Sequence, residues 1–191
     1  MLTVFTLTEG EISNRDAETE RLIARMSRGE IAAMGELYEL IGTDVYAFAL
    51  SKTANKEWAE DVTHDTFVRI WKSAGLYHPL GKPLAWVFTI EINLIRKMFN
   101  KSKSFVPLEE AIEVEGDGQR FDDALITNEF LRQMLEALSE EERTVVTLHI
   151  VSGFKHREIA RLLNKPLSTV LSKYNRAIKK LQIKVMEKEG Q

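Results

Sequence analysis

The amino-acid sequence predicts an all-α fold of two small helical modules joined by an acidic flexible linker. Apolar residues recur at the three- and four-residue spacing of amphipathic helices on both sides of one interruption, residues 104–121. The 191 residues include only 4 prolines and 10 glycines, which leaves little material for the many turns of a β-sandwich. The apolar share of 44% and the charged share of 29% are typical of a folded chain.

The composition excludes several kinds of protein. The chain has no cysteine, which excludes disulfide scaffolds, thiol nucleophiles and cysteine-ligated zinc. It has no run of about 18 apolar residues, so we expect no membrane insertion. The 4 histidines are scattered, and neither a glycine-rich phosphate loop nor a metal-spaced His/Glu set occurs. We therefore expect a cytoplasmic protein that is not an enzyme, with no catalytic residue, no metal site and no cofactor.

The net charge of −3 conceals two basic regions. Residues 104–128 carry seven acidic residues against one basic residue, whereas residues 153–188 carry ten basic residues against two acidic ones. A second basic stretch, residues 96–103, has four basic residues and no acidic one. Charge runs are often only solvated surface, so each needs a structural context before it indicates nucleic-acid binding.

Four helices with one shared core are predicted in the first module, residues 13–103. Asn55 suits the N-cap of the third helix, and Pro83 suits the first turn of the fourth. The sequence from Tyr77 to Pro83 reads as a turn between them. The four helices are expected at residues 14–28, 30–51, 56–74 and 83–101.

The second module, residues 122–188, follows a linker at residues 104–121. The linker contains a proline and two glycines and has no sustained periodicity. The second module begins with an apolar-periodic helix that ends near Leu135. Ser139 and Glu142 then form a capping-box sequence that opens the next helix, which Gly153 ends.

The strongest local signal is the segment GFKHREIARLLNKPLSTVLSKYNRAIKKLQ, residues 153–182. Ala160 is small enough for a crossing helix to approach, Asn164 can adopt the left-handed conformation, and Pro166 prevents simple continuation. Two helices joined by such a turn form a helix-turn-helix, whose second helix enters the DNA major groove. An antiparallel helical hairpin with a basic surface is the alternative. We favour DNA binding, because the turn residues, the small residue and the basic second helix coincide.

Three segments together resemble the motifs of bacterial sigma factors. AEDVTHDTFVRIWKSAG (59–75) resembles the signature of their second conserved region, and PLAWVFTIEINLIRKMFNK (83–101) resembles the promoter-melting helix after it. ALSEEERTVVTLHIVSGFKHREIARLLNKPLSTVLSKYNRAIKKL (137–181) resembles the fourth region, which reads the upstream promoter element. The two-module layout is similar to the extracytoplasmic-function (group four) sigma factors of RNA polymerase. The resemblance covers residues 15–103 and 122–185.

The resemblance implies a role for each part of the chain. Residues 13–103 would bind core polymerase and melt and read the minus-ten element, and residues 122–188 would read the minus-thirty-five element. The expected partners are the clamp helices of the largest polymerase subunit, the flap of the second-largest subunit, promoter DNA and an anti-sigma factor clamped between the modules. Linker carboxylates would mimic phosphates on the path of the RNA, although a solubilising tether is the alternative. These linker acids are Glu109, Glu110, Glu113, Glu115 and Asp117.

Helical spacing, the helix-turn-helix and the resemblance together assign individual residues. On the helix at 56–74, one face is expected in the core (Ala59, Val62, Thr66, Ile70), and another is expected to bind polymerase (Asp61, His64, Asp65, Val68). The minus-ten contacts expected on the fourth helix are Asn93, Arg96, Lys97 and Lys101, with Tyr77 and Lys82 from the preceding loop. The minus-thirty-five contacts expected are Ser168, Thr169, Leu171, Ser172, Lys173, Arg176, Lys179 and Lys180. Trp86 is expected in the core rather than as a platform for bases.

Some residues depart from the pattern of the family. Glu91 stands where these sigma factors commonly have a small residue, and a carboxylate there is expected to repel the non-template strand. Leu171 cannot hydrogen-bond, so it is expected to contact a thymine methyl group or to pack internally. Lys173 lacks the bidentate fork that an arginine would offer to guanine. These departures concern the promoter sequence rather than the mode of binding.

Two other kinds of protein remain as alternatives. A stand-alone helix-turn-helix regulator would bind palindromic duplex operators without polymerase. A polymerase-binding antagonist would not need a working DNA-reading helix, and the intact basic helix argues against it. A sigma factor would bind promoter DNA poorly when free and well only with core enzyme.

Overall fold

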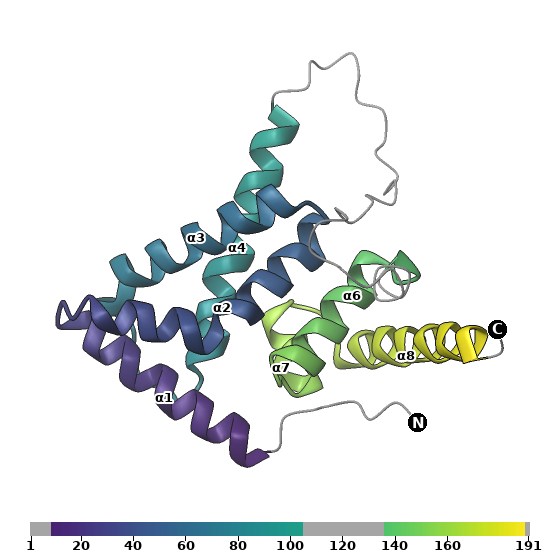
Figure 1. Cartoon of the computed structure of the whole chain (residues 1–191), viewed down its shortest axis with the longest axis horizontal. Coiled ribbons are helices and arrows are strands. Elements are labelled where there is room, and N and C mark those ends of the chain that lie inside the picture. The colour runs from purple at the N-terminus through teal and green to yellow at the C-terminus, as the bar shows by residue number, and fades with distance from the viewer. Residues whose placement is uncertain (1–8, 105–135, 190–191) are drawn as a thin grey trace.

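The computed structural model describes residues 9–104 and 136–189, which form two helical modules (Figure 1). These residues contain helices and no strand, which confirms the predicted all-α class. The linker expected at 104–121, apart from Ser104, and the helix expected to end near Leu135 lie outside the described residues. The first module comprises α1 (Glu9–Ser27), α2 (Ala32–Thr53), α3 (Lys56–Ser73), the 3-10 turn η1 (Ala74–Leu76) and α4 (Pro83–Ser104). The second comprises α6 (Glu140–Val146), the π-helical turn η3 (Thr147–Val151), α7 (His156–Leu162) and α8 (Leu167–Glu189).

The helix ends of the first module follow local side-chain chemistry. Asn55 caps α3 as predicted, because its side-chain oxygen accepts a hydrogen bond of 2.9 Å from the Trp58 N–H. Ala54, at the end of α2, adopts a left-handed φ of 48° and reverses the chain. The helices lie within five residues of their expected bounds at every end. The largest difference is at the start of α1, which begins at Glu9 instead of residue 14, and α3 ends at Ser73, where the chain passes into the 3-10 turn η1.

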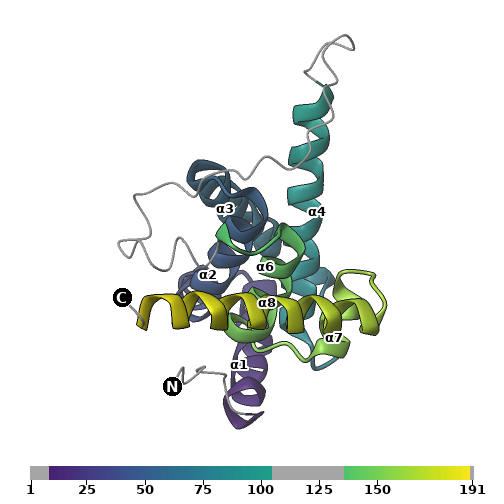
Figure 2. The same ribbon diagram turned by 90° about the vertical axis from the view of Figure 1, so that its right-hand side faces the viewer.

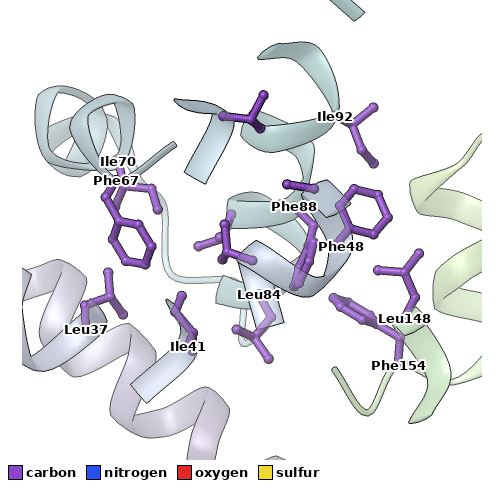
Figure 3. Close-up of a cluster of buried hydrophobic side chains, with 14 of the residues drawn as sticks. Leu37, Ile41, Phe48, Phe67, Ile70, Leu84, Phe88, Ile92, Leu148 and Phe154 are labelled. Atoms are coloured by element: carbon purple, nitrogen blue, oxygen red, sulfur yellow. The ribbon is translucent and has the colours of Figure 1, made fainter. Parts of the chain in front are cut away.

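The core of the first module is built from one face of each helix. The side chains of Leu37, Phe48, Phe67 and Phe88 are at most 2% exposed. Such side chains contribute roughly 1.5–3 kcal/mol each when fully buried. The four residues of α3 predicted to face the core are all buried, namely Ala59, Val62, Thr66 and Ile70. Figure 3 shows part of this cluster.

The second module is organised around the capping box at the start of α6. The Ser139 hydroxyl accepts from the Glu142 N–H at 3.4 Å, and the Glu142 carboxylate accepts from the Ser139 N–H at 2.9 Å. This pair confirms the predicted start of the helix. The helix then widens into the π-turn η3, and Gly153, with φ of 74°, ends it as predicted. The left-handed region favours glycine because it has no Cβ.

The two modules pack against each other through aromatic side chains. Phe88 of α4 contacts Phe48 of α2 and Phe154 of the second module edge-to-face, with ring centroids 5.3 Å apart in both pairs. Figure 3 shows Phe154 and Leu148 pointing toward these first-module rings. Lys52 with Glu140, and Lys82 with Glu158 at 2.7 Å, form ion pairs between the modules. Figure 2 shows α8 lying crosswise to α4. The C-terminal end of α4 extends beyond the other helices.

Glu91 lies inside this core, so the expectation that its carboxylate faces DNA is wrong. It is 0% exposed, and neither carboxyl oxygen has a hydrogen-bond partner among the described residues. The reason is its register, because Phe88, Glu91, Ile92 and Ile95 share the inner face of α4 at i, i+3, i+4 and i+7. Burial raises the pKa of Glu91 well above its ordinary value; the nearby backbone of Ala49 acts against this rise, and Asp44 adds to it.

Replacing Glu91 with glutamine should stabilise the protein at alkaline pH. A carboxyl group whose pKa is raised by folding costs stability as the pH rises from its ordinary pKa of 4.5 toward the raised value. Glu91→Gln removes this titration. We expect its Tm at pH 8 to exceed that of the wild type by a few degrees. For a chain of this size, a gain of about 1 kcal/mol in the free energy of unfolding raises the Tm by roughly 2–4 °C. The difference should shrink as the pH falls toward 4.5.

Thermal unfolding followed by circular dichroism between pH 4.5 and 9 measures this difference, with the exposed Glu39→Gln as the control. A Tm difference that does not change with pH would show that Glu91 does not titrate in the core.

Candidate nucleic-acid interface

The helix-turn-helix of the second module has the geometry that its sequence predicts. Asn164 adopts a left-handed φ of 52° between α7 and α8. The Lys165 N–H donates to the Ala160 carbonyl at 2.9 Å, which closes the turn. Ala160 is 8% exposed and Val170 is 1% exposed, so a small residue lies where the two helices meet. The turn therefore holds α8 at a fixed angle to α7, with its polar side facing out.

The outer side of α8 presents most of the residues predicted to read DNA. Ser168, Leu171, Ser172, Arg176, Lys179 and Lys180 are exposed, whereas Thr169 and Lys173 are half-buried. Leu171 is 39% exposed, so of the two expectations for it, internal packing is wrong. The Arg176 guanidinium donates to the Ser172 hydroxyl at 2.9 Å. These two candidate DNA contacts are therefore coupled in the structure.

Three lysines of this unit are paired with the first turn of α6. Lys173 lies 2.6 Å and Lys165 lies 3.4 Å from the Glu141 carboxylate, and Lys180 lies 2.8 Å from the Glu142 carboxylate. The hydrogen bond from Lys173 is the main cause that lowers the pKa of Glu141. Sequence reasoning missed these pairs, because the partners are far apart in the chain and only the tertiary packing of α6 on α8 brings them together.

Two of the histidines that look scattered in the sequence meet behind the helix-turn-helix. The rings of His149 and His156 are 4.2 Å apart, and Tyr174 of α8 packs against both at 4.9 and 4.7 Å. The Nδ1 atom of His149 lies 2.8 Å from the Phe154 carbonyl. Burial lowers the pKa of His156, and His149 lowers it further. Both effects favour the neutral ring, which suits a packing role between η3, α7 and α8.

The predicted minus-ten residues divide into two groups. Asn93, Arg96 and Lys97 are exposed on one face of α4, and Lys101 follows on the same helix. The loop residues are engaged within the protein instead. The Tyr77 hydroxyl donates to the Glu20 carboxylate at 2.9 Å, its ring packs 5.0 Å from that of Trp86, and Lys82 pairs with Glu158. Burial is the main cause that raises the pKa of Tyr77. Trp86 is half-buried and packed against the core, in line with its expected place.

The predicted polymerase-binding residues share one face of α3. Asp61, His64 and Asp65 are exposed, and Val68 is half-buried beside them. The side chains of His64 and Asp65 are 79% and 68% exposed. The opposite face of α3 is buried in the core, so the helix is anchored there while these side chains are accessible to a partner.

The described residues hold no group of three or more His, Cys, Asp or Glu that could bind a metal ion. Within the same residues, no helix is both long enough and apolar enough to span a membrane.

Comparison with known families matches both modules. Residues 37–105 match the family "Sigma-70 region 2", and residues 130–181 match "Sigma-70, region 4". The chain is similar to the ECF RNA polymerase sigma factor BldN of Streptomyces coelicolor, with 28% identity over 171 residues. That alignment covers 86% of this chain and 65% of BldN.

Two solved structures have a similar fold. CnrH, solved in complex with the cytosolic domain of CnrY, matches with a TM-score of 0.61 and 22% identity, covering 89% of this chain and 98% of CnrH. RpoE of Bartonella quintana, solved in complex with the anti-sigma factor NepR, matches with a TM-score of 0.58 and 23% identity, covering 80% of this chain and 96% of RpoE. The order of the two matched regions, the helical fold and the relatives agree. The chain belongs to the sigma-70 family of RNA polymerase sigma factors and is similar to members of its extracytoplasmic-function group.

Proposed function

We propose that this chain is a dissociable promoter-specificity subunit of bacterial RNA polymerase. It directs core polymerase to particular promoters and performs no covalent chemistry itself. The observation that carries this proposal is the joint presence of three exposed faces: an acidic face on α3 and basic faces on α4 and α8. A stand-alone DNA-binding regulator needs only one of them. The role places the protein in the cytoplasm with polymerase.

The α3 face binds the clamp helices of the largest polymerase subunit. Asp61 and Asp65 supply charge for steering, and the half-buried Val68 supplies apolar contact. This assignment is supported by the exposure of the acids on a helix whose other face is buried. Core polymerase would also contact the second module through the flap of the second-largest subunit.

The outer face of α4 contacts the melted minus-ten strand. Arg96 and Lys97 meet phosphates, and Asn93 reads a base edge, since an amide can both donate and accept hydrogen bonds. Single-stranded bases gain roughly 1–3 kcal/mol each by stacking on aromatic rings. Tyr77 becomes such a surface only if it leaves Glu20, and Lys82 becomes a phosphate contact only if it leaves Glu158.

The outer side of α8 reads the minus-thirty-five duplex. Ser168, Thr169 and Ser172 near its start can hydrogen-bond to base edges, and Leu171 can contact a thymine methyl group. Arg176 and Lys179 lie farther along the same helix and meet phosphates or, for Arg176, a base. The geometry of the turn supports this use, because a rigid angle between α7 and α8 is needed to seat one helix in the groove.

Reading both elements requires the modules to separate. Elements centred near minus ten and minus thirty-five are about 25 base pairs apart, on the order of 85 Å of duplex. The modules here share one aromatic cluster through Phe88 and Phe154, whose ring centroids are 5.3 Å apart. An anti-sigma partner that prefers this closed arrangement would inhibit the protein. The solved complex of the related RpoE with an anti-sigma factor supports such a partner.

Run-off transcription with core polymerase and a pool of genomic promoter fragments tests the proposal directly. We expect new transcripts from a restricted set of promoters.

Asp61→Ala combined with Asp65→Ala should weaken co-elution with core polymerase by about tenfold, which corresponds to 1.4 kcal/mol. Glu39→Ala, which changes an exposed acid on α2 instead of α3, should leave co-elution unchanged.

The absence of transcripts would have two meanings. If the chain still co-elutes with core polymerase, it is an antagonist. If it binds palindromic duplex without polymerase and does not co-elute, it is a stand-alone regulator.

Lys179 and Lys180 should respond differently to replacement by alanine. Lys179→Ala should weaken duplex binding about equally for all sequences and reduce the log-log salt slope by about 0.9. Lys180 contacts phosphate only if it leaves Glu142, so Lys180→Ala should reduce the slope by less. Lys180→Ala should also lower the Tm, because it leaves the buried Glu142 carboxylate without its lysine. Lys180→Arg should keep the Tm.

Fluorescence anisotropy at several salt concentrations and thermal unfolding measure these effects. A loss confined to one base position would contradict the phosphate role of either lysine.

A covalent link between the modules should block promoter-dependent transcription. The chain has no cysteine, so Lys52→Cys with Glu140→Cys provides a unique pair for a short bismaleimide at the module interface. If roughly nine-tenths of the chains are crosslinked, run-off activity should fall about tenfold, since only the open fraction is competent. The untreated double variant and the two treated single variants are the controls. Full activity of the crosslinked protein would show that the modules need not separate.

A further inference from the structure

Glu141 belongs to α6 and precedes the helix-turn-helix in sequence, but its side chain contacts two lysines of that motif. It lies in the first turn of α6, and its two carboxylate oxygens contact different lysines. One oxygen is 2.6 Å from Lys173 on α8, and the other is 3.4 Å from Lys165 in the turn between α7 and α8. A single carboxylate therefore links the turn to the DNA-reading helix.

We propose that Glu141 is a specificity-determining residue that holds Lys165 and Lys173 away from DNA phosphates. This inference rests on the proposed function of α8. A lysine bound to phosphate contributes affinity for any sequence, because the phosphate backbone is the same at every base pair. Holding these two lysines reduces that sequence-independent part of the affinity, so the base-edge contacts of Ser168, Thr169 and Ser172 decide a larger share of binding.

The surroundings favour the pairing at this position. Lys173 has only 22% of its side chain exposed, so it is packed along the protein rather than extended into solvent. A carboxylate in the first turn of a helix is stabilised by the helix dipole. The neighbouring acids cannot replace Glu141, because Glu140 pairs with Lys52 and Glu142 pairs with Lys180.

The pairing also distinguishes lysines on the same helix. Lys173 must leave Glu141 before it can contact phosphate, whereas no described residue forms an ion pair with Lys179. Lys184 pairs with Glu187 at 2.9 Å near the end of α8, far along the helix from the turn. Glu187 thus provides a matched control, since it is an exposed glutamate paired with a lysine of the same helix.

The test compares Glu141→Gln with Glu187→Gln in duplex binding by the whole chain. The chain alone is titrated onto a shuffled duplex at several salt concentrations. Its complex with core polymerase is titrated onto a promoter fragment selected by run-off transcription and onto the shuffled duplex. We expect Glu141→Gln to steepen the log-log salt slope by about 0.9 for each lysine released and to raise shuffled-duplex affinity on the order of eightfold per lysine at 0.1 M salt. The preference of the complex for the promoter should fall, and Glu187→Gln should change little.

A double-mutant cycle checks that the effect passes through the lysines. Lys165→Gln should hardly change the salt slope in the wild-type background but should reduce it by about 0.9 when combined with Glu141→Gln. Circular dichroism of each variant checks that the fold is retained. A purely structural role for Glu141 would lower the Tm without this coupling.

The two arms separate the possible failures. If Glu141→Gln leaves the salt slope of the chain alone at the value of Glu187→Gln, the inference is wrong, whatever the function. If the slope steepens but promoter preference is unchanged, Glu141 holds the lysines without determining specificity, and the inference is again overturned. If the wild type with core polymerase prefers no promoter, the proposed function fails by itself.

Discussion

The edge-to-face packing of Phe48, Phe88 and Phe154 is the contact on which the arrangement of the whole molecule depends. Phe88 lies at its centre and belongs to α4, the helix that also carries the candidate minus-ten residues on its other face. Packing Phe154 onto this ring joins the modules and leaves the basic faces of α4 and α8 on the outside. The same contact brings Glu158 of α7 to Lys82, so the loop proposed to read DNA is engaged while the modules are together. The burial of these aromatic rings thus determines which charged side chains are paired within the protein and which remain exposed.

Acidic residues organise the basic surface of the second module. The three glutamates in the first turn of α6 pair with Lys52, Lys173 and Lys180, and Glu141 also reaches Lys165. Their position is favourable for the helix itself, because carboxylates at a helix N-terminus offset its partial positive charge. One short segment therefore caps a helix, links the modules and orients side chains beside the surface that is proposed to read DNA. The net charge of the module is a poor guide to its binding strength, since part of its positive charge is already paired.

The interior of the first module contains buried charged groups that lie away from its exposed basic face. Arg15 and Asp44 form a nearly buried ion pair, and burial raises the pKa of Asp44 in spite of Arg15. Glu91 lies buried nearby without a hydrogen-bond partner among the described residues. A buried carboxyl group of this kind reduces stability at neutral pH. The helix that carries the candidate minus-ten residues is therefore held less stably than apolar packing alone would hold it.

Local sequence determined the helices, their caps and the exposed faces, because these depend on residues three or four apart. Asn55, the capping box at Ser139 and the turn at Asn164 were all predictable for this reason, and so was the buried face of α3. Tertiary structure alone decided which distant groups meet. The sequence contains no local signal that Phe154 packs on Phe88, that Glu141 holds two lysines, or that His149 and His156 pack edge-to-face against Tyr174. Glu91 is the instructive error, since its charge suggested an outward position while its helical register placed it in the core. Register is local, but only the packing of α4 against α2 decides which of its faces is buried.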